Sequence, residues 1–216
     1  MSIWTSKALA ALACAGLTAC AGLNIAPQNR SISVLGGAVT VAPPAGYCAN
    51  PKVSTAGDDN AVVLIGRCTA LSPVVPALLT ASIGAAGSGT ALDAGPVALT
   101  SFFTSDQGRA MLASSGNAKD AVVTASETEE GAVLLLIKDR SLGEYWRGIL
   151  ALRGRLVMVS ATGVESSLLA PTDGRALLSQ TMTSLRRANA EVAKPLAVAP
   201  SAPIDGAAGS AAAPKG

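Results

Sequence analysis

Histidine is absent from all 216 residues of this chain. Because imidazole is the proton acceptor in Ser-His-Asp and Cys-His arrangements, both kinds of catalytic site are excluded. Zinc, copper and haem sites that use histidine ligands are excluded for the same reason. The other residues form no pattern that is typical of a metal or cofactor site. The sequence therefore predicts no cofactor and no metal.

Aromatic and charged residues are scarce. Aromatic side chains make up 3% of the chain and charged side chains 14%, with a net charge of +2. The densest basic group is the pair Arg186-Arg187. A nucleic-acid surface needs a dense basic stripe or aromatic side chains on which bases stack. The sequence therefore predicts no nucleic-acid partner.

Half of the residues are hydrophobic, but the apolar run near the N-terminus is short. It covers residues 8–19, about 12 residues, whereas a helix that spans a bilayer takes about 20. A short apolar run that follows Lys7 is typical of a secretory signal. We therefore interpret residues 1–19 as a signal peptide.

The end of this run resembles a bacterial lipobox, Leu17-Thr18-Ala19-Cys20. In that motif a lipid is attached to the cysteine, which becomes the first residue after cleavage. Cys14 is the alternative, but it lacks a leucine three residues before it. We predict that Cys20 carries the lipid and anchors the chain to a membrane, although an ordinary secretory signal stays open. Ala21 in place of aspartate resembles the pattern of lipoproteins sent to the outer membrane, facing the periplasm.

Two cysteines, Cys48 and Cys68, follow the predicted anchor. In an oxidising compartment such a pair favours a structural disulfide. A redox pair is the alternative, but redox sites favour the close Cys-x-x-Cys spacing. We predict a disulfide between them.

The stretch from Gly131 to Gly163 predicts the core of a sheet. It holds three apolar runs, and Arg153-Gly154 between the last two fits a two-residue hairpin turn. Pairing across this turn places Leu152 opposite Arg155 and Gly148 opposite Val159. Both faces of the hairpin are apolar near the turn, which indicates cover on both sides, at least in part. With a further strand at 121–126, these runs predict an antiparallel meander.

The other elements complete an α+β fold. Strands are predicted at 39–41, 61–65 and 78–83, and residues 84–95 are predicted to be a mobile loop. Helices are predicted at 96–115, restarted by a cap at Thr104, and at 171–188, capped by Thr172. We expect an antiparallel sheet of about seven strands packed by two main helices, like a sandwich. Phe102 and Phe103 fit core packing, with a ligand pocket as the alternative.

Composition divides the chain into four parts. After the signal peptide, residues 20–32 are predicted to be a tether and residues 33–188 a globular domain. Alanine, proline, glycine and serine then dominate residues 189–216, which leaves little to bury. This composition predicts a disordered tail.

The densest polar and aromatic group lies in and beside the connection between two predicted strands. Loops held by rigid strands often carry function, so we take this group as the candidate binding loop. A solvated loop with the tryptophan in the core is the alternative. Two of its acids suggest acid–base chemistry of the glycosidase kind, without any pattern that makes this specific. The group consists of Asp139, Arg140, Glu144, Tyr145, Trp146 and Arg147.

Four short motifs resemble a family of small alphaproteobacterial lipoproteins, over roughly residues 33–188. They are Gly46-Tyr47-Cys48, Gly66-Arg67-Cys68, Tyr145-Trp146-Arg147-Gly148 and Gly154-Arg155-Leu156-Val157. The resemblance implies a lipid-anchored envelope protein and implies no activity. Names such as transport ATPase, which some members carry, find no support here, because the chain has no P-loop and no Asp-Lys-Thr-Gly motif.

The order of the elements is also loosely similar to Mog1/PsbP-like sandwiches, but a fold alone does not give a function. We expect a non-enzymatic binding or structural module of the cell envelope, with an envelope protein or the cell wall as its partner. The alternatives are a periplasmic carrier of a small ligand and a hydrolase that uses Asp139 and Glu144. An apolar cavity between sheet and helices would favour the carrier, and raised carboxyl pKa values would favour the hydrolase. The sequence does not indicate an oligomeric state.

Overall fold

The computed structural model describes residues 31–164 and 167–190. The predicted signal peptide, Cys20, nearly all of the tether and the tail beyond residue 190 lie outside these ranges. Within them, no helix has the length and apolarity needed to cross a membrane.

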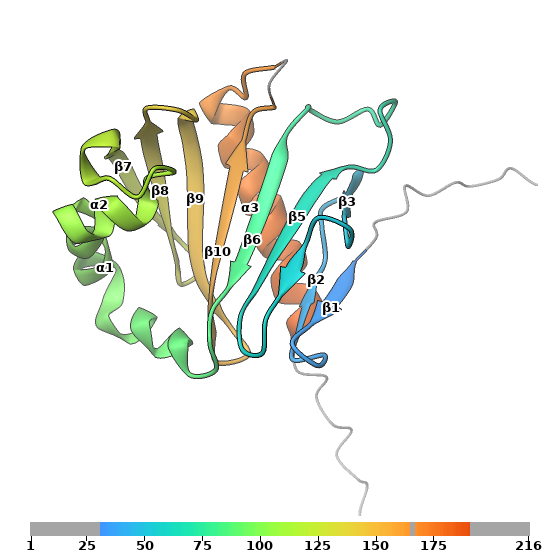
Figure 1. Cartoon of the computed structure of the whole chain (residues 1–216), viewed down its shortest axis with the longest axis horizontal. Helices are drawn as coiled ribbons and strands as arrows, with labels where there is room; N and C mark the ends of the chain where they lie inside the picture. The colour runs from blue at the N-terminus through green and yellow to red at the C-terminus, as the bar shows by residue number, and fades with distance from the viewer. Residues whose placement is uncertain (1–30, 165–166, 191–216) are drawn as a thin grey trace, which may run out of the picture.

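One large antiparallel sheet forms the centre of the fold (Figure 1). Its strands are, in spatial order, β3 (Tyr47–Ala49), β5 (Ala61–Arg67), β6 (Leu78–Ile83), β10 (Arg155–Thr162), β9 (Gly143–Leu152), β8 (Ala132–Asp139) and β7 (Ala121–Glu129). The short strand β4 (Thr55–Ala56) pairs with β5. Helices pack on this sheet, which confirms the predicted α+β class.

The β9–β10 hairpin has the register that the sequence predicts. Leu152 pairs with Arg155, and Gly148 pairs with Val159. Arg153 and Gly154 have φ values of 52° and 72°, the left-handed conformation that a tight two-residue hairpin turn requires at both positions. Strands β7 to β10 form the predicted meander.

Helix α3 (Pro171–Asn189) covers one face of the sheet. The predicted apolar stripe of Leu178, Met182 and Leu185 is buried against β9 and β10. Gly148 permits this close approach, because a Cβ atom there would lie 2.6 Å from Sδ of Met182. The predicted cap at Thr172 is wrong. The N-cap residue is Ala170, which makes no side-chain capping bond, and Pro at the first helical turn needs no N–H acceptor.

A separate hairpin of β1 (Ile32–Val34) and β2 (Val39–Val41) attaches to the end of α3. The Thr40 N–H donates to Asn189 Oδ1 at 2.9 Å, and Asn189 Nδ2 donates to the Thr40 carbonyl at 2.7 Å. Asn189 is therefore a buried part of the helix, although the sequence places it at the start of the tail.

Helices α1 (Gly95–Thr104) and α2 (Asp106–Leu112) lie on the other face of the sheet, over β7 to β9. Leu99, Phe103 and Leu112 form a second core with the side chains of these strands. The predicted cap at Thr104 is one residue off. The cap is Ser105, whose hydroxyl accepts the Gly108 N–H at 3.2 Å.

Residues 84–95, which the sequence predicts as a loop, contain the 3-10 helix η1 (Ser88–Ala94). This segment is tied to the β9–β10 turn. The Gly89 N–H donates to the Gly154 carbonyl at 3.1 Å, and the Leu156 N–H donates to Ser88 Oγ at 2.9 Å. A second short 3-10 helix, η2 (Ala118–Asp120), leads into β7.

Cys48 on β3 and Cys68 after β5 form a disulfide, with their Cα atoms 4.8 Å apart. The two strands are neighbours in the sheet, so the bond closes the edge of the sheet opposite β7. This agrees with the pairing that the sequence predicts.

The two faces of the sheet are covered unequally. Figure 1 shows α3 running behind the middle of the sheet, whereas α1 and α2 stand to one side, over β7 to β9. On their face, neither α1 nor α2 packs closely on β6 or β10, although the 3-10 helix η1 contacts β10. This uneven cover positions the candidate site.

Candidate ligand-binding site

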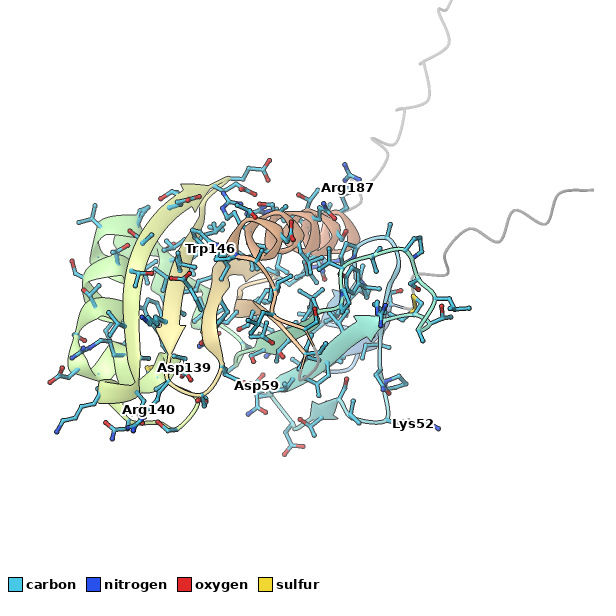
Figure 2. All side chains as sticks on the ribbon, turned by 90° about the horizontal axis from the view of Figure 1, so that it is seen from above. Lys52, Asp59, Asp139, Arg140, Trp146 and Arg187 are labelled. Atoms are coloured by element: carbon cyan, nitrogen blue, oxygen red, sulfur yellow. A yellow bond between two sulfur atoms is a disulfide. The ribbon has the colours of Figure 1, made fainter. Side chains whose placement is uncertain are left out.

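The structure does not bring the predicted binding loop together as one site. Successive side chains of a strand point to opposite faces of the sheet. Tyr145 therefore packs into the core under α1 and α2, and Trp146 packs into the core under α3. Figure 2 shows Trp146 beside α3, with Asp139 and Arg140 away from it toward the β8–β9 turn.

Trp146 has a structural role, as the alternative interpretation of this segment proposes. Its ring is buried, and the guanidinium carbon of Arg175 lies 5.6 Å from the ring centroid. Arg175 also forms ion pairs with Glu127 and Glu129, each at 2.8 Å. This group holds α3 against the β7–β8 hairpin.

Asp139 is also part of the structure rather than of a reactive site. The residue is 2% exposed, and its carboxylate accepts the backbone N–H groups of Ser114, Ser141 and Leu142 at 2.8 to 3.0 Å. Burial alone would raise the pKa of Asp139, but the hydrogen bonds from Ser114, Leu142 and Ser141 outweigh it and hold the pKa well below its usual value. A carboxyl group that stays ionised cannot act as a general acid.

The other charged members of the predicted loop lie apart from Asp139. The Arg140 side chain is 84% exposed and lies 3.6 Å from Asp120. Glu144 is also exposed, at the start of β9. The predicted hydrolase pair therefore has no shared, enclosed position.

An apolar cavity of about 360 Å³ lies between the helices and the sheet. Every side chain in its wall is hydrophobic, and its volume falls in the usual range of small-molecule sites, about 300–1,000 Å³. Phe102 and Phe103 line it, so the alternative role predicted for this pair has a geometric basis. The wall consists of Ala91, Ala94, Ala98, Leu99, Phe102, Phe103, Met111, Ile149, Leu156 and Met158.

A second hollow, of about 400 Å³, lies over the strands β6 and β10 and beside the first cavity. The two share Met111 and Met158 in their walls, so they adjoin. Unlike the apolar cavity, the second hollow has polar groups in its floor. Its wall consists of Leu78, Thr80, Ser82, Met111, Leu142, Tyr145, Arg147, Met158, Ser160 and Thr162.

Arg147 is the charged side chain of this second hollow. It is half-buried, and its Nε donates to Ser160 Oγ at 2.9 Å. Its guanidinium carbon lies 5.4 Å from the ring centroid of Tyr145. Tyr145 is fixed in turn by a hydrogen bond from its hydroxyl to the Leu112 carbonyl at 3.1 Å, and burial raises its pKa above the ordinary value, against the lowering effect of Arg147.

Exposed apolar side chains gather at one end of the sheet. Strands β5, β8 and β10 run in the same direction, so the loops that follow them share this end. Leu71 and Leu168 are 93% and 96% exposed there, and Leu142 is 46% exposed. Isolated exposed leucines are ordinary on a protein surface, and these three lie at the same end of the sheet, on the loops that follow β5, β8 and β10.

Sequence reasoning found Arg147 and the phenylalanine pair but missed the residues of β10 that join them. Along β10, buried residues that face α3 alternate with residues of the opposite face, namely Leu156, Met158 and Ser160. The apolar character of both faces of the hairpin was the signal, because it indicated cover on the second face as well. Within the described residues, no group of three potential metal ligands occurs.

Comparisons with known proteins give little more than the layout. No protein-family model matches the chain, and no curated protein matches it. Among solved structures, the chain is similar to a mutant of the protein Mog1, with 13% identity, a TM-score of 0.39, and coverage of 74% of this chain and 94% of that chain. This weak similarity agrees with the loose Mog1/PsbP-like layout and says nothing about function. Nothing in the comparisons supports the lipoprotein family.

We predict that Asp139→Asn lowers the free energy of unfolding by about 1–3 kcal/mol at pH 7, because an amide accepts fewer of these hydrogen bonds. The folded-state pKa of Asp139 is depressed, so its stabilisation is present above the unfolded-state pKa of about 3.9 and is lost as the pH falls. Urea unfolding of both proteins from pH 7 to pH 3 measures this. The difference should shrink below about pH 4. A difference that does not change with pH would contradict this account.

Proposed function

We propose that this chain is a lipid-anchored, non-enzymatic protein of the cell envelope that binds a small, largely apolar ligand. The observation that carries the proposal is the apolar cavity between α1, α2 and the sheet. It favours the small-ligand carrier among the functions that the sequence leaves open.

The hydrophobic effect makes such a cavity a binding site. Removing apolar surface from water is favourable by about 25 cal/mol per Å², so a ligand that buries about 200 Å² gains about 5 kcal/mol. Association itself costs at least about 4 kcal/mol, so an apolar body alone gives weak binding unless further contacts add to it.

The same cavity wall argues against catalysis there. It contains no carboxylate, hydroxyl or thiol. The one strongly perturbed carboxylate of the candidate loop, Asp139, is held ionised by backbone hydrogen bonds at the end of β8. A binding function therefore fits the described chain better than a hydrolase does.

The envelope location rests on the sequence of the N-terminal region. The lipobox-like motif ending at Cys20 supports an acyl anchor, and the resemblance to small lipoproteins supports the same role. The disulfide between Cys48 and Cys68 fits an oxidising compartment such as the periplasm. The outer membrane, facing the periplasm, is the location that these features favour.

A second candidate function is docking onto an envelope protein. The leucine-bearing end of the sheet, defined by Leu71, Leu142 and Leu168, favours it, because a partner would cover side chains that are otherwise in water. The two functions use different parts of the domain and are compatible.

We predict that growth with a radioactive fatty acid labels the wild-type protein and that Cys20→Ala abolishes the label. The reason is that the lipid is attached through the Cys20 sulfur. Cys14→Ala is the control and should keep the label. Equal labelling of the Cys20→Ala variant would rule out the proposed anchor.

We predict that wild-type protein binds the neutral probe N-phenyl-1-naphthylamine and that Ala98→Trp weakens this binding at least about tenfold, a loss of about 1.4 kcal/mol. Ala98 lies at the rim of the cavity, so an indole there fills it without displacing a packed side chain. Fluorescence titration measures the affinity.

The matched control is Val97→Trp, on the neighbouring residue of α1, which is 82% exposed and lies outside the cavity wall. It should leave the affinity unchanged. Failure of the wild type to bind the probe, or equal loss in the two variants, would contradict binding in this cavity.

A further inference from the structure

We propose that the ligand is an amphiphile with one anionic head group, which Arg147 binds while the apolar body lies in the adjoining cavity. The inference rests on the proposed ligand-binding function and adds the chemical class of the ligand.

The first observation is that Arg147 makes no ion pair with any residue that the structure describes. The other half-buried or buried arginines of the described chain each pair with a carboxylate. These are Arg109, Arg155, Arg175 and Arg186, with partners 2.5 to 2.9 Å away. A partly desolvated charge without a counterion is unfavourable, so the position of Arg147 is one that a bound anion would stabilise.

The second observation is how the guanidinium is held. Nε is engaged by Ser160 Oγ, and the Tyr145 ring lies beside the group. The two Nη atoms donate to no described residue, and they belong to the planar fork that binds carboxylate or phosphate through two parallel hydrogen bonds. The fork is thus oriented before a ligand arrives, which lowers the entropy lost on binding.

The third observation is the composition of the hollow around Arg147. Hydroxyl groups of Thr80, Ser82, Ser160 and Thr162 line it, and no carboxylate does. Hydroxyl groups can donate to the oxygen atoms of an anion. The net charge of the hollow wall is that of Arg147 alone, so the wall is complementary to a single negative charge.

The fourth observation is that the charged hollow leads into the apolar cavity. Ser160, Met158 and Leu156 follow one another on the same face of β10, from the head-group hollow to the apolar wall. They span about 13 Å, at about 3.3 Å per residue. An amphiphile of that length or more fits this path, and methionine side chains adapt to a flexible chain.

A fatty acid and a phosphate monoester of an alkyl chain both carry an anionic head group on an apolar chain. The experiment therefore compares the binding of dodecanoate, dodecyl phosphate and the neutral control dodecanol to the full chain. All three are used at concentrations below micelle formation. Affinities are measured by displacement of N-phenyl-1-naphthylamine. Wild-type protein should bind at least one of the two anions at least about tenfold more tightly than dodecanol, which corresponds to about 1.4 kcal/mol. The anion that binds more tightly identifies the head group.

Arg147→Gln should remove this preference, because it should weaken binding of the anion at least about tenfold and leave binding of dodecanol unchanged. Arg147→Lys keeps the charge without the fork and should retain part of the preference. Far-ultraviolet circular dichroism and the thermal midpoint check that the variants fold. Dodecanol binding provides a second check within the assay, because it depends on the cavity and not on Arg147.

The outcomes separate the two proposals. If wild-type protein binds dodecanol and both anions equally, or if Arg147→Gln leaves the anion preference intact, the head-group assignment is overturned while ligand binding stands. If wild-type protein binds none of the three, the proposed function itself fails. If Arg147→Gln and Arg147→Lys each lose affinity for dodecanol and for the anion to the same extent, the head-group assignment is also overturned.

Discussion

The packing of α3 on the β9–β10 hairpin is the contact on which the rest of the fold depends. Gly148 leaves room for Met182 and Leu178, so the helix lies close to the sheet and packs on the middle of one face. The ion pairs of Arg175 and the buried hydrogen bonds of Asn189 fasten the helix to the β7–β8 hairpin and to β2. The two adjoining hollows of the candidate site lie on the other face.

On that other face, incomplete cover produces the site. Helices α1 and α2 pack over β7 to β9 and stop short of β6 and β10, while η1 packs on part of β10, so a cavity forms along the edge of the helices. Asp139 keeps this edge in place, because its carboxylate joins the end of α2, through Ser114, to the β8–β9 turn. A residue that sequence reasoning connects with catalysis thus stabilises the wall of a binding site.

The sequence predicts the sheet well, because its signals are local. The register of β9 and β10 follows from one glycine-containing turn, and the stripe of α3 follows from helical spacing. The candidate site is predicted less well, because neighbours in a strand lie on opposite faces. Tyr145 and Trp146 are adjacent in the chain and belong to different cores. The residues that complete the site with Arg147 come from β6 and β10, and only the tertiary structure shows that they meet. The cap at Ser105 was missed because the neighbouring Thr104 offers a similar hydroxyl group, and the cap at Ala170 was missed because α3 begins at a proline without a side-chain cap.

The central claim is that one amphiphile occupies both adjoining hollows, with its charge at Arg147. A crystal structure of the protein soaked with 12-bromododecanoate tests it most directly, because the bromine atom can be located by its anomalous signal. We predict the bromine beside Leu99, Phe103 or Ile149 and the carboxylate within about 3 Å of the Arg147 guanidinium nitrogens. A ligand bound only elsewhere, such as in the hollow beside Tyr47 and Val74, would contradict the account.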